Sequence, residues 1–422
     1  MPRIRPLLLC LPLLLTACAA APPLPPPPAE ESAETVPVSA PQPEQIVAAW
    51  IPYFSVSALL SDPDEAVCRE HVSSYLQKLS GFGINTVFVH VCAFGESIYP
   101  SVYYPALPAA GEHDGMQIFT DICAEQQIAL HAWINPLRLQ TGEVMAQQTG
   151  DAALCAWYKN GKLRKRNLTT WDGRFYLDPA ADSTRKFLKG VITELMLKYH
   201  PAGIHADDYF YPTDTPEFDA DAFARSGADD LAEWRRGNIS ALMQAMYGAV
   251  HDADENAVFS VSPQGSLQKN RETLFADAEK WCRDGGYCDL IIPQLYFGYR
   301  NEACPFAEML RDWTELPRAD SVRMAVGLAV YKYGHPDPPA GSGRDEWCTA
   351  EKLPAVQTED VLSDRTLCGV AYYHGDALLT LPETEREAVE AAVSAMHSKW
   401  GSGAENAADA SPGTVLNRKK RR

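Results

Sequence analysis

The strongest constraint on the fold is a pattern that recurs eight times between about residues 45 and 399: a short apolar run, a polar loop and a helical stretch. Strands that alternate with helices pair in parallel through right-handed crossovers, and eight such units close a (β/α)8 barrel. We therefore predict an α/β fold, a TIM barrel with loop insertions at the C-terminal face of its strands. The runs predicted as strands are Ile46–Ile51, Ile84–Val91, Ile128–Ile134, Ala202–Asp207, Ala257–Ser262, Asp289–Tyr296, Val322–Ala329 and Cys368–His374.

An open, doubly wound sheet is the alternative to a closed barrel. It would need a glycine-rich turn after the first strand, and no G-x-G-x-x-G motif follows Ile51. The polar segments after the third, sixth and seventh runs are long, so we expect them to form insertions over one face. With the two ends set aside, the length favours a single barrel domain over residues 45–399 rather than two or three domains.

The N-terminal end has the features of an export signal. Arg3 and Arg5 precede an apolar stretch, Leu7–Leu15, that is too short to span a bilayer. Leu15-Thr16-Ala17-Cys18 follows and resembles the bacterial lipobox. We expect residues 1–17 to be a lipoprotein signal peptide and Cys18 to carry the lipid, which would place the protein outside the cytoplasm, anchored at the bacterial cell envelope. An ordinary secretory signal with an incidental cysteine is the alternative.

Two polar segments flank the barrel. Residues 18–44 are rich in proline, with Pro25–Pro28 in a row, and such a composition favours a semi-rigid extended tether. Residues 400–422 contain few large apolar side chains and end in five basic residues, so we expect a disordered basic tail.

The charge balance narrows the choice of ligand. The formal net charge is −18 at pH 7, which argues against a general nucleic-acid binder, because neutralising phosphates requires a basic face. An anionic substrate would have to meet a local basic group, and a near-neutral or weakly charged ligand suits the acidic surface better.

Polar and aromatic side chains gather where the predicted strands end. In TIM barrels the chemistry sits at these C-terminal ends. Aromatic rings stack on sugar faces, and paired carboxylates with amides serve glycosidic bond cleavage, so the set is typical of a carbohydrate site. The residues at or just beyond the ends are Tyr53, His90, Trp133, Asn135, Asp207, Asp208, Ser262, Gln264, Gln294, Tyr296, Tyr331, Lys332, Tyr372 and His374.

The adjacent acids Asp207 and Asp208 carry the sharpest signal. Two carboxyl groups that leave an apolar strand together can differ in pKa, because burial and the neighbour's charge raise one of them. The alternative is structural: one acid caps the following segment or pairs with Arg138 or Arg174.

Several motifs in order along the chain resemble the glycosyl-hydrolase-like family 10 of bacterial lipoproteins, from about residue 46 to residue 376. That family resembles glycoside hydrolases with a TIM barrel, and a characterised branch cleaves peptidoglycan glycan strands stripped of their peptides. The resemblance implies a carbohydrate substrate and no cofactor. The motifs are Gly203–Pro212, His131–Pro136, Tyr176–Ala180, Ser260–Pro263, Asp289–Tyr296 and Pro305–Ala307.

The resemblance also assigns residues. The family's fourth-strand acid pair falls on Asp207 and Asp208, and its sixth-strand Gln and Tyr on Gln294 and Tyr296. Its third-strand Trp and Asn fall on Trp133 and Asn135. The further residues expected to contact substrate, from their places near strand ends, are His90, Glu96, Tyr209, Tyr331, Lys332 and His374.

The chain departs from the family pattern after the second strand. Cys92 stands where the family usually has an arginine, and Glu96 where it usually has an aspartate. The lost arginine bears on substrate preference but leaves the acid pair in place. Lys332 could meet a sugar carboxylate, such as the lactyl group of muramic acid, or be a solvated loop lysine.

If the substrate carries 2-acetamido groups, the resemblance suggests a mechanism. One acid protonates the leaving oxygen, while the other orients the acetamido group, to which Tyr296 donates. Two other readings remain open. One is a catalytically inactive barrel that binds cell-wall glycan. The other is a metal site built from Asp207 and four strand histidines, which lack the usual ligand spacing: His90, His131, His205 and His374.

Overall fold

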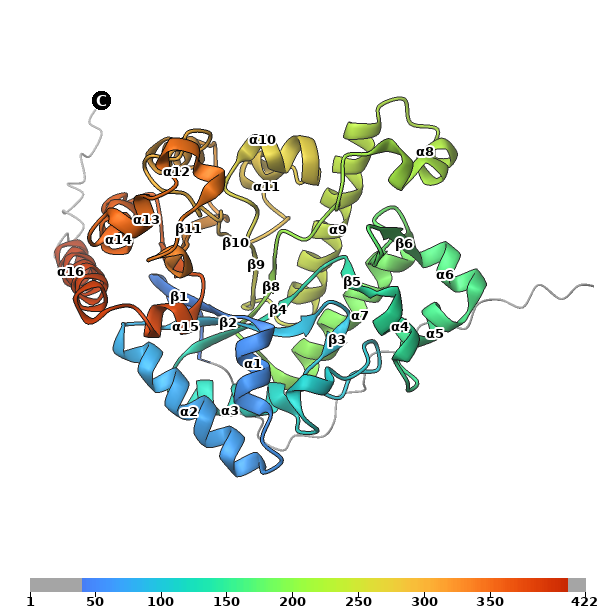
Figure 1. Ribbon diagram of the computed structural model, residues 1–422, viewed down its shortest axis with the longest axis horizontal. Helices are drawn as coiled ribbons and strands as arrows, with labels where there is room; N and C mark the ends of the chain where they lie inside the picture. The colour runs from blue at the N-terminus through green and yellow to red at the C-terminus, as the bar shows by residue number, and fades with distance from the viewer. Residues whose placement is uncertain (1–39, 409–422) are drawn as a thin grey trace, which may run out of the picture.

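The computed structural model describes residues 40–408, with side chains to residue 395, and its centre is a closed barrel of eight parallel strands (Figure 1). β1 (Ile46–Ile51) pairs with β2 (Thr86–Ala93) on one side and β12 (Gly369–Tyr372) on the other, which closes the ring. The predicted TIM barrel is therefore confirmed, and every barrel strand overlaps a predicted run. Between β2 and β12 the order is β4 (Ala129–Ile134), β8 (Gly203–Ala206), β9 (Val258–Val261), β10 (Leu290–Ile291) and β11 (Arg323–Leu328).

The strands are buried on both faces, as the continuous apolar runs require. Along β1, Ile46, Ala48 and Trp50 point into the barrel, where they meet Phe88 and Trp133. The intervening residues of β1 point outward into the larger core that the strands share with the surrounding helices. The alternation thus fixes which side chains can reach the site inside the barrel mouth.

Helices surround the barrel, and several begin at an acidic cap. Asp230 accepts a hydrogen bond from the amide of Glu233 at 2.9 Å, and Asp64 accepts one from Ala66 at 2.9 Å. The main helices are α1 (Tyr53–Leu60), α2 (Glu65–Gly81), α3 (Gly115–Glu125), α7 (Asp182–Tyr199), α9 (Leu231–Ala253), α11 (Ala278–Asp284), α12 (Phe306–Thr314), α14 (Leu353–Ser363) and α16 (Glu383–Ala408).

A large insertion follows β4, the third predicted run, where an insertion is predicted. It contains a three-stranded antiparallel sheet in the order β5 (Arg138–Thr141), β7 (Arg174–Leu177) and β6 (Leu168–Trp171), which lies beside the barrel with its helices (Figure 1). The shorter elements are β3 (Glu96–Ser97), α4 (Gly142–Gln147), α5 (Ala153–Lys159), α6 (Gly161–Asn167), α8 (Ala220–Ser226), α10 (Leu267–Lys269), α13 (Glu346–Thr349) and α15 (Gly375–Leu379).

The chain ends bear on the predicted boundaries. α16 continues to Ala408, past residue 399, so the stretch predicted as a disordered tail begins as helix, and its remainder, 409–422, lies outside the described residues. The predicted signal, Cys18 and most of the tether also lie outside them. Over residues 40–408, no helix is long and apolar enough to cross a membrane.

Candidate active site

The acid pair follows the C-terminal end of β8, in the mouth of the barrel. Asp207 is buried with 3% of its surface exposed. Its carboxylate accepts hydrogen bonds from Nε1 of Trp133 at 3.0 Å, from Nδ2 of Asn135, and from the amide of Tyr209 at 3.1 Å. Three donors from two segments hold one carboxylate, so its position is fixed by the ends of β4 and β8 together.

Burial raises the pKa of Asp207 to about 8, and the charge of Asp208 adds to the increase. The hydrogen bonds from Trp133, Tyr209 and Asn135 oppose the shift without cancelling it. At neutral pH the pair therefore retains a proton that two free aspartates would have lost. The hydrogen bond from the Tyr209 amide is the local cap that the structural alternative predicts. Asp207 also accepts hydrogen bonds from Trp133 and Asn135, at the end of β4, which a local cap does not explain. Among the described residues, neither Arg138 nor Arg174 forms an ion pair with the two acids.

Asp208 is half-exposed and lines a cavity of about 270 Å³. Its carboxylate accepts hydrogen bonds from Nε2 of Gln264 at 2.8 Å and Nε2 of Gln294 at 3.1 Å. Nε2 of Gln294 also donates to the carbonyl of Ser262 at 2.9 Å, which fixes the amide. The cavity is lined by Arg138, Tyr176, Asp208, Tyr209, Phe210, Tyr211, Pro212, Gln264 and Leu274.

Three tyrosines form a second wall near the acids. The ring of Tyr296 lies 6.0 Å from that of Tyr331 and 5.7 Å from that of Tyr373, and the last two are 5.6 Å apart. Burial, with smaller contributions from the neighbouring tyrosines and Asp208, raises the pKa of Tyr296 well above its ordinary value. Its hydroxyl therefore stays protonated and can donate.

Lys332 is not free to meet a substrate. Its Nζ donates to Asp337 at 2.7 Å and to the carbonyl of Tyr296 at 2.8 Å, and the side chain is largely covered. The structure therefore differs from both interpretations of this lysine, a contact with a sugar carboxylate and a solvated loop position. Lys332 instead holds the backbone of Tyr296 in place.

His90 and Trp133 also differ from the expectation that they contact substrate. Their rings stack at 3.8 Å with an angle of 7° between planes, and both side chains are buried. Burial lowers the pKa of His90 to about 3, so the imidazole is neutral. Trp133 presents no open face to a sugar, and the two residues lie behind Asp207, which Trp133 holds through its indole nitrogen.

Two further predicted residues lie apart from the acid pair. Glu96 is buried and accepts from Gln140 at 2.8 Å and Gln148 at 3.1 Å, within the insertion after β4. The ring of His374 packs 5.2 Å from Phe54 of α1. Asn135, Tyr209 and Gln294, in contrast, donate hydrogen bonds to Asp207 or Asp208.

The histidines inside the barrel form a hydrogen-bonded network. Both His131 and His205 contact Oγ of Ser260, at 3.0 and 2.9 Å, and Nε1 of Trp50 donates to His205 at 3.0 Å. Burial lowers the pKa of each of the two histidines. No group of three or more His, Cys, Asp or Glu side chains among residues 40–395 is arranged to hold a metal ion.

Sequence reasoning missed two contributors. Tyr373 directly follows the last residue of β12 and belongs to the tyrosine wall. The sequence offers Arg138 only as a partner for the acids, whereas its guanidinium lies 4.3 Å from the ring centre of Tyr209 and 4.9 Å from that of Phe94. The cluster of arginines and aromatic residues around Tyr176 could have pointed to this, because Arg138 and Arg174 begin two paired strands of the insertion.

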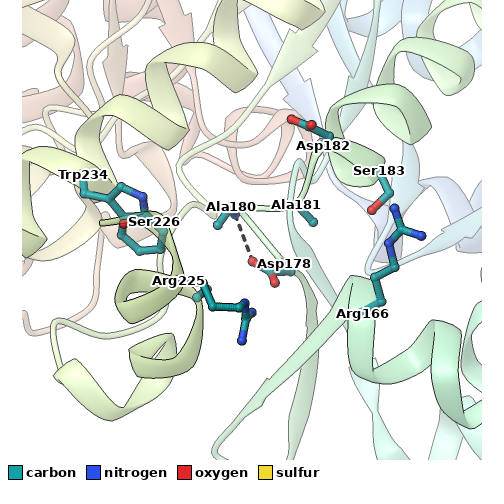
Figure 2. A pocket seen from close by; sticks show the side chains of 10 residues that line it. Arg166, Asp178, Ala180, Ala181, Asp182, Ser183, Arg225, Ser226 and Trp234 are labelled. Carbon is teal, nitrogen blue, oxygen red and sulfur yellow. Dashed lines mark hydrogen bonds between the residues drawn. The ribbon is translucent and has the colours of Figure 1, made fainter. Parts of the chain in front are cut away.

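A second cavity of about 370 Å³ lies between α7, α8 and the end of β7. Figure 2 shows Arg166 and Arg225 entering it from opposite sides, with Asp178 and Trp234 on its walls. Asp207 and Asp208 do not line this cavity, so it is separate from the acid pair.

Comparisons with known proteins agree with the predicted family and with the barrel. A family model described as Glycosyl hydrolase-like 10 matches residues 45–340. Glycosyl hydrolase DigH of Escherichia coli (strain K12) is 25% identical over 399 residues, which covers 84% of each chain. Glycosyl hydrolase YngK of Bacillus subtilis (strain 168) is 22% identical and covers 66% of this chain and 59% of its own length.

Solved structures show the same fold at low identity. The glycoside hydrolase domain of PgaB (BpsB) from Bordetella bronchiseptica matches with a TM-score of 0.51 and 14% identity, over 82% of this chain and 97% of that one. An α-L-fucosidase isoenzyme from Paenibacillus thiaminolyticus matches with a TM-score of 0.52 and 11% identity, over 78% of this chain and 46% of that one. These likenesses show the fold, a TIM barrel.

Proposed function

The chain belongs to the glycosyl hydrolase-like 10 family, and from that premise we propose that it cleaves glycosidic bonds in a cell-envelope polysaccharide, namely peptidoglycan glycan strands stripped of their peptides. The observation that carries the proposal is the acid pair: one carboxyl group is buried with a raised pKa, and the other faces a cavity between two amide donors. Two carboxyl groups with different environments are what acid catalysis of glycoside hydrolysis needs.

The contacts suggest how the roles divide. Asp208 lines the cavity and is the member that can touch a bound sugar, whereas Asp207 is enclosed by its three donors. We assign substrate contact to Asp208, and to Asp207 the storage of the proton that the pair holds at neutral pH. For a 2-acetamido sugar, the acetamido oxygen bonds to the anomeric carbon as the glycosidic C–O bond breaks, Tyr296 donates to the acetamido group, and the acid pair gives its proton to the leaving oxygen. Water then attacks the anomeric carbon, which opens the cyclic intermediate, and the acid pair takes a proton back from this water.

Single replacements of the acids test the proposal. Asp208→Asn and Asp207→Asn should each lower kcat on purified, peptide-free glycan strands by about 100-fold or more, measured as new reducing ends. Asp252→Asn is the matched control, because Asp252 is exposed near the C-terminal end of α9 and pairs with Lys189 at 3.6 Å. Full activity in both acid variants would refute the proposal. A wild-type protein that co-sediments with glycan but releases no products would instead be a binding protein.

We further propose that the protein is exported and lipid-anchored through Cys18, on the strength of the lipobox-like Leu15-Thr16-Ala17-Cys18. Cys18→Ala should move the protein from the membrane fraction to the soluble fraction and abolish incorporation of labelled fatty acid. Unchanged membrane association with no label in the wild type would contradict the anchor.

A further inference from the structure

We propose that Arg138 recognises a free carboxylate on the sugar bound beside Asp208, so that the site is specific for a glycan with acidic amino-sugar units. The inference rests on the proposed function and names the residue that recognises the carboxylate of the stripped strands. Arg138 begins β5 in the insertion after β4, and its backbone is paired with Tyr176 of β7.

The first support is the position of the guanidinium. Arg138 and Asp208 line the same cavity of about 270 Å³, so a sugar that reaches the acid also passes the arginine. The guanidinium lies over the ring of Tyr209 at 4.3 Å and over that of Phe94 at 4.9 Å. Contact with aromatic rings orients the planar group, and the guanidinium has further N–H groups beside the one that donates to the Tyr209 side chain.

The second support is that this cation has no carboxylate partner. Within the described residues Arg138 forms no ion pair, and Asp208 takes its hydrogen bonds from the amides of Gln264 and Gln294. Lys332, which contacts the backbone of Tyr296 in the tyrosine wall, is tied to Asp337. An arginine held in place without an anion fits a carboxylate from the substrate, because guanidinium and carboxylate match in bidentate geometry.

The third support is electrostatic. The chain has a net charge of −18, and Asp208 itself would repel an acidic sugar. Arg138 offsets that repulsion where it arises, and Arg174, 5.7 Å from the ring of Phe94, adds positive charge nearby. An anionic ligand on this acidic protein needs such a local basic group.

The inference has a direct consequence for peptidoglycan. The stem peptide is attached through the lactyl carboxylate of the muramic acid unit, which becomes a neutral, bulky amide. Only a strand without peptide presents the free carboxylate that Arg138 can bind. The contact between the Arg138 guanidinium and this carboxylate would therefore make the protein prefer stripped strands.

Two glycans that differ only in this charge test the inference: stripped strands with free carboxylates, and the same strands with the carboxylates converted to primary amides. The wild type should cleave the free form with a kcat/KM about 10- to 100-fold above that for the amide form, mainly through KM. Arg138→Gln should remove this preference, by lowering kcat/KM for the free form about 10- to 100-fold more than for the amide form. Arg138→Lys should retain part of it, because lysine keeps the charge but loses the bidentate geometry.

The matched control is Arg225→Gln, which removes the same charge from the second cavity (Figure 2) and should leave the preference intact. Equal losses on both glycans in Arg138→Gln, or no preference in the wild type, would overturn the inference. Binding of both glycans to Asp208→Asn, with and without Arg138→Gln, is measured in parallel. If nothing is cleaved but binding still depends on Arg138 and the carboxylate, the proposed hydrolase activity fails while the carboxylate specificity stands.

Discussion

Asp207 connects the chemistry of the site to the stability of the fold. Its pKa is about 8 in the folded chain, whereas a free aspartate titrates near 3.9. Between these values the folded protein binds a proton that the unfolded chain has released. Because stability decreases with rising pH wherever the native state binds more protons, this residue makes the protein less stable from about pH 4 to about pH 8.

The wild type and Asp207→Asn should differ in how steeply the free energy of unfolding changes with pH. At pH values between the two pKa values, Asp207 contributes a decrease of up to about 1.4 kcal/mol per pH unit to the free energy of unfolding. Asp207→Asn cannot titrate, so its stability should decrease less steeply over this range. Urea unfolding at several pH values measures both slopes. Parallel curves for the two proteins would mean that Asp207 is ionised in the folded state.

The hydrogen bond from Trp133 to Asp207 should affect the pH at which activity falls on the alkaline side. The indole nitrogen of Trp133 donates to Asp207, and this hydrogen bond lowers the pKa of that carboxyl. Trp133→Phe keeps an aromatic ring against His90 but loses the donor. The pKa of Asp207 should rise, which shifts the alkaline limb of kcat/KM to higher pH, and the rate should fall about tenfold.

Trp281→Phe is the matched control for this change. Trp281 is also fully buried, and its Nε1 donates to Oγ of Ser240 at 3.0 Å, in the helical layer. It should lose stability without moving the pH profile. An alkaline limb that stays in place in Trp133→Phe would show that this limb does not belong to Asp207.

At the scale of elements, strand periodicity predicts the barrel and only part of the site. The acids, Asn135 and Gln294 lie at or just beyond the C-terminal ends of predicted strands, so their convergence could be read from the sequence. Tyr372 is fully buried and its hydroxyl contacts Thr358 at 2.9 Å, whereas Tyr373 faces the tyrosine wall. The alternation of β12 continues past its end: Val370 and Tyr372 pack in the outer core, and Ala371 and Tyr373 pack in the inner cluster. The period of two therefore predicts Tyr373, and not Tyr372, for the site.

Long side chains from insertions escape sequence reasoning for another reason. Lys332 and Arg138 are both basic residues near strand ends, and nothing local distinguishes them. Their roles depend on tertiary partners: Asp337 neutralises Lys332, and aromatic rings orient Arg138. Packing between elements that are distant in sequence therefore decides which of the two cations can still bind a ligand.

The turn between β2 and β3 positions Phe94, and its second residue should be intolerant of a side chain. Phe94 and Gly95 both have positive φ, 54° and 81°, and the amide of Phe94 donates to Oδ1 of Asn135 at 2.8 Å. A Cβ at Gly95 would lie 2.7 Å from Cδ2 of Leu139 and 2.9 Å from Cδ2 of Leu154. Gly95→Ala should therefore cost about 2–3 kcal/mol, the sum of left-handed strain and crowding.

Gly173→Ala separates the two contributions. Gly173 has φ of 72°, but no atom lies within 4 Å of the position that a Cβ would occupy, so only the backbone strain of about 1 kcal/mol should appear. Thermal unfolding compares the two variants. Equal losses would show that the leucines move aside without cost.

At the scale of the whole molecule, the two ends of the barrel differ in role. The acid pair, Arg138 and the tyrosine wall lie at the C-terminal ends of the strands, where TIM barrels carry their chemistry. The opposite end is covered by the residues that precede β1. Arg323 donates to the carbonyls of Pro43 and Glu44, and Nδ2 of Asn85 donates to that of Gln45 at 2.8 Å.

The residues just before β1 should therefore contribute to stability, although their sequence predicts part of an extended tether. Nε2 of Gln42 donates to Oγ1 of Thr86 at 3.2 Å, and its carbonyl oxygen contacts Nε2 of the buried His131. A protein that begins at Ala40 keeps these contacts, whereas one that begins at Gln45 leaves His131 and Arg323 without them. The shorter protein should lose about 2–4 kcal/mol, because buried groups lose their partners.

Activity separates this effect from damage to the site. Both truncated proteins retain every residue that lines the cavity of Asp208, at the far end of the barrel, so their kcat/KM at 25 °C should be equal. Gln42→Ala in the longer protein should reproduce about half of the stability loss, since it removes one of the two sets of contacts. If the protein that begins at Gln45 unfolds at the same urea concentration as the one that begins at Ala40, the domain begins at β1 and the preceding contacts contribute nothing.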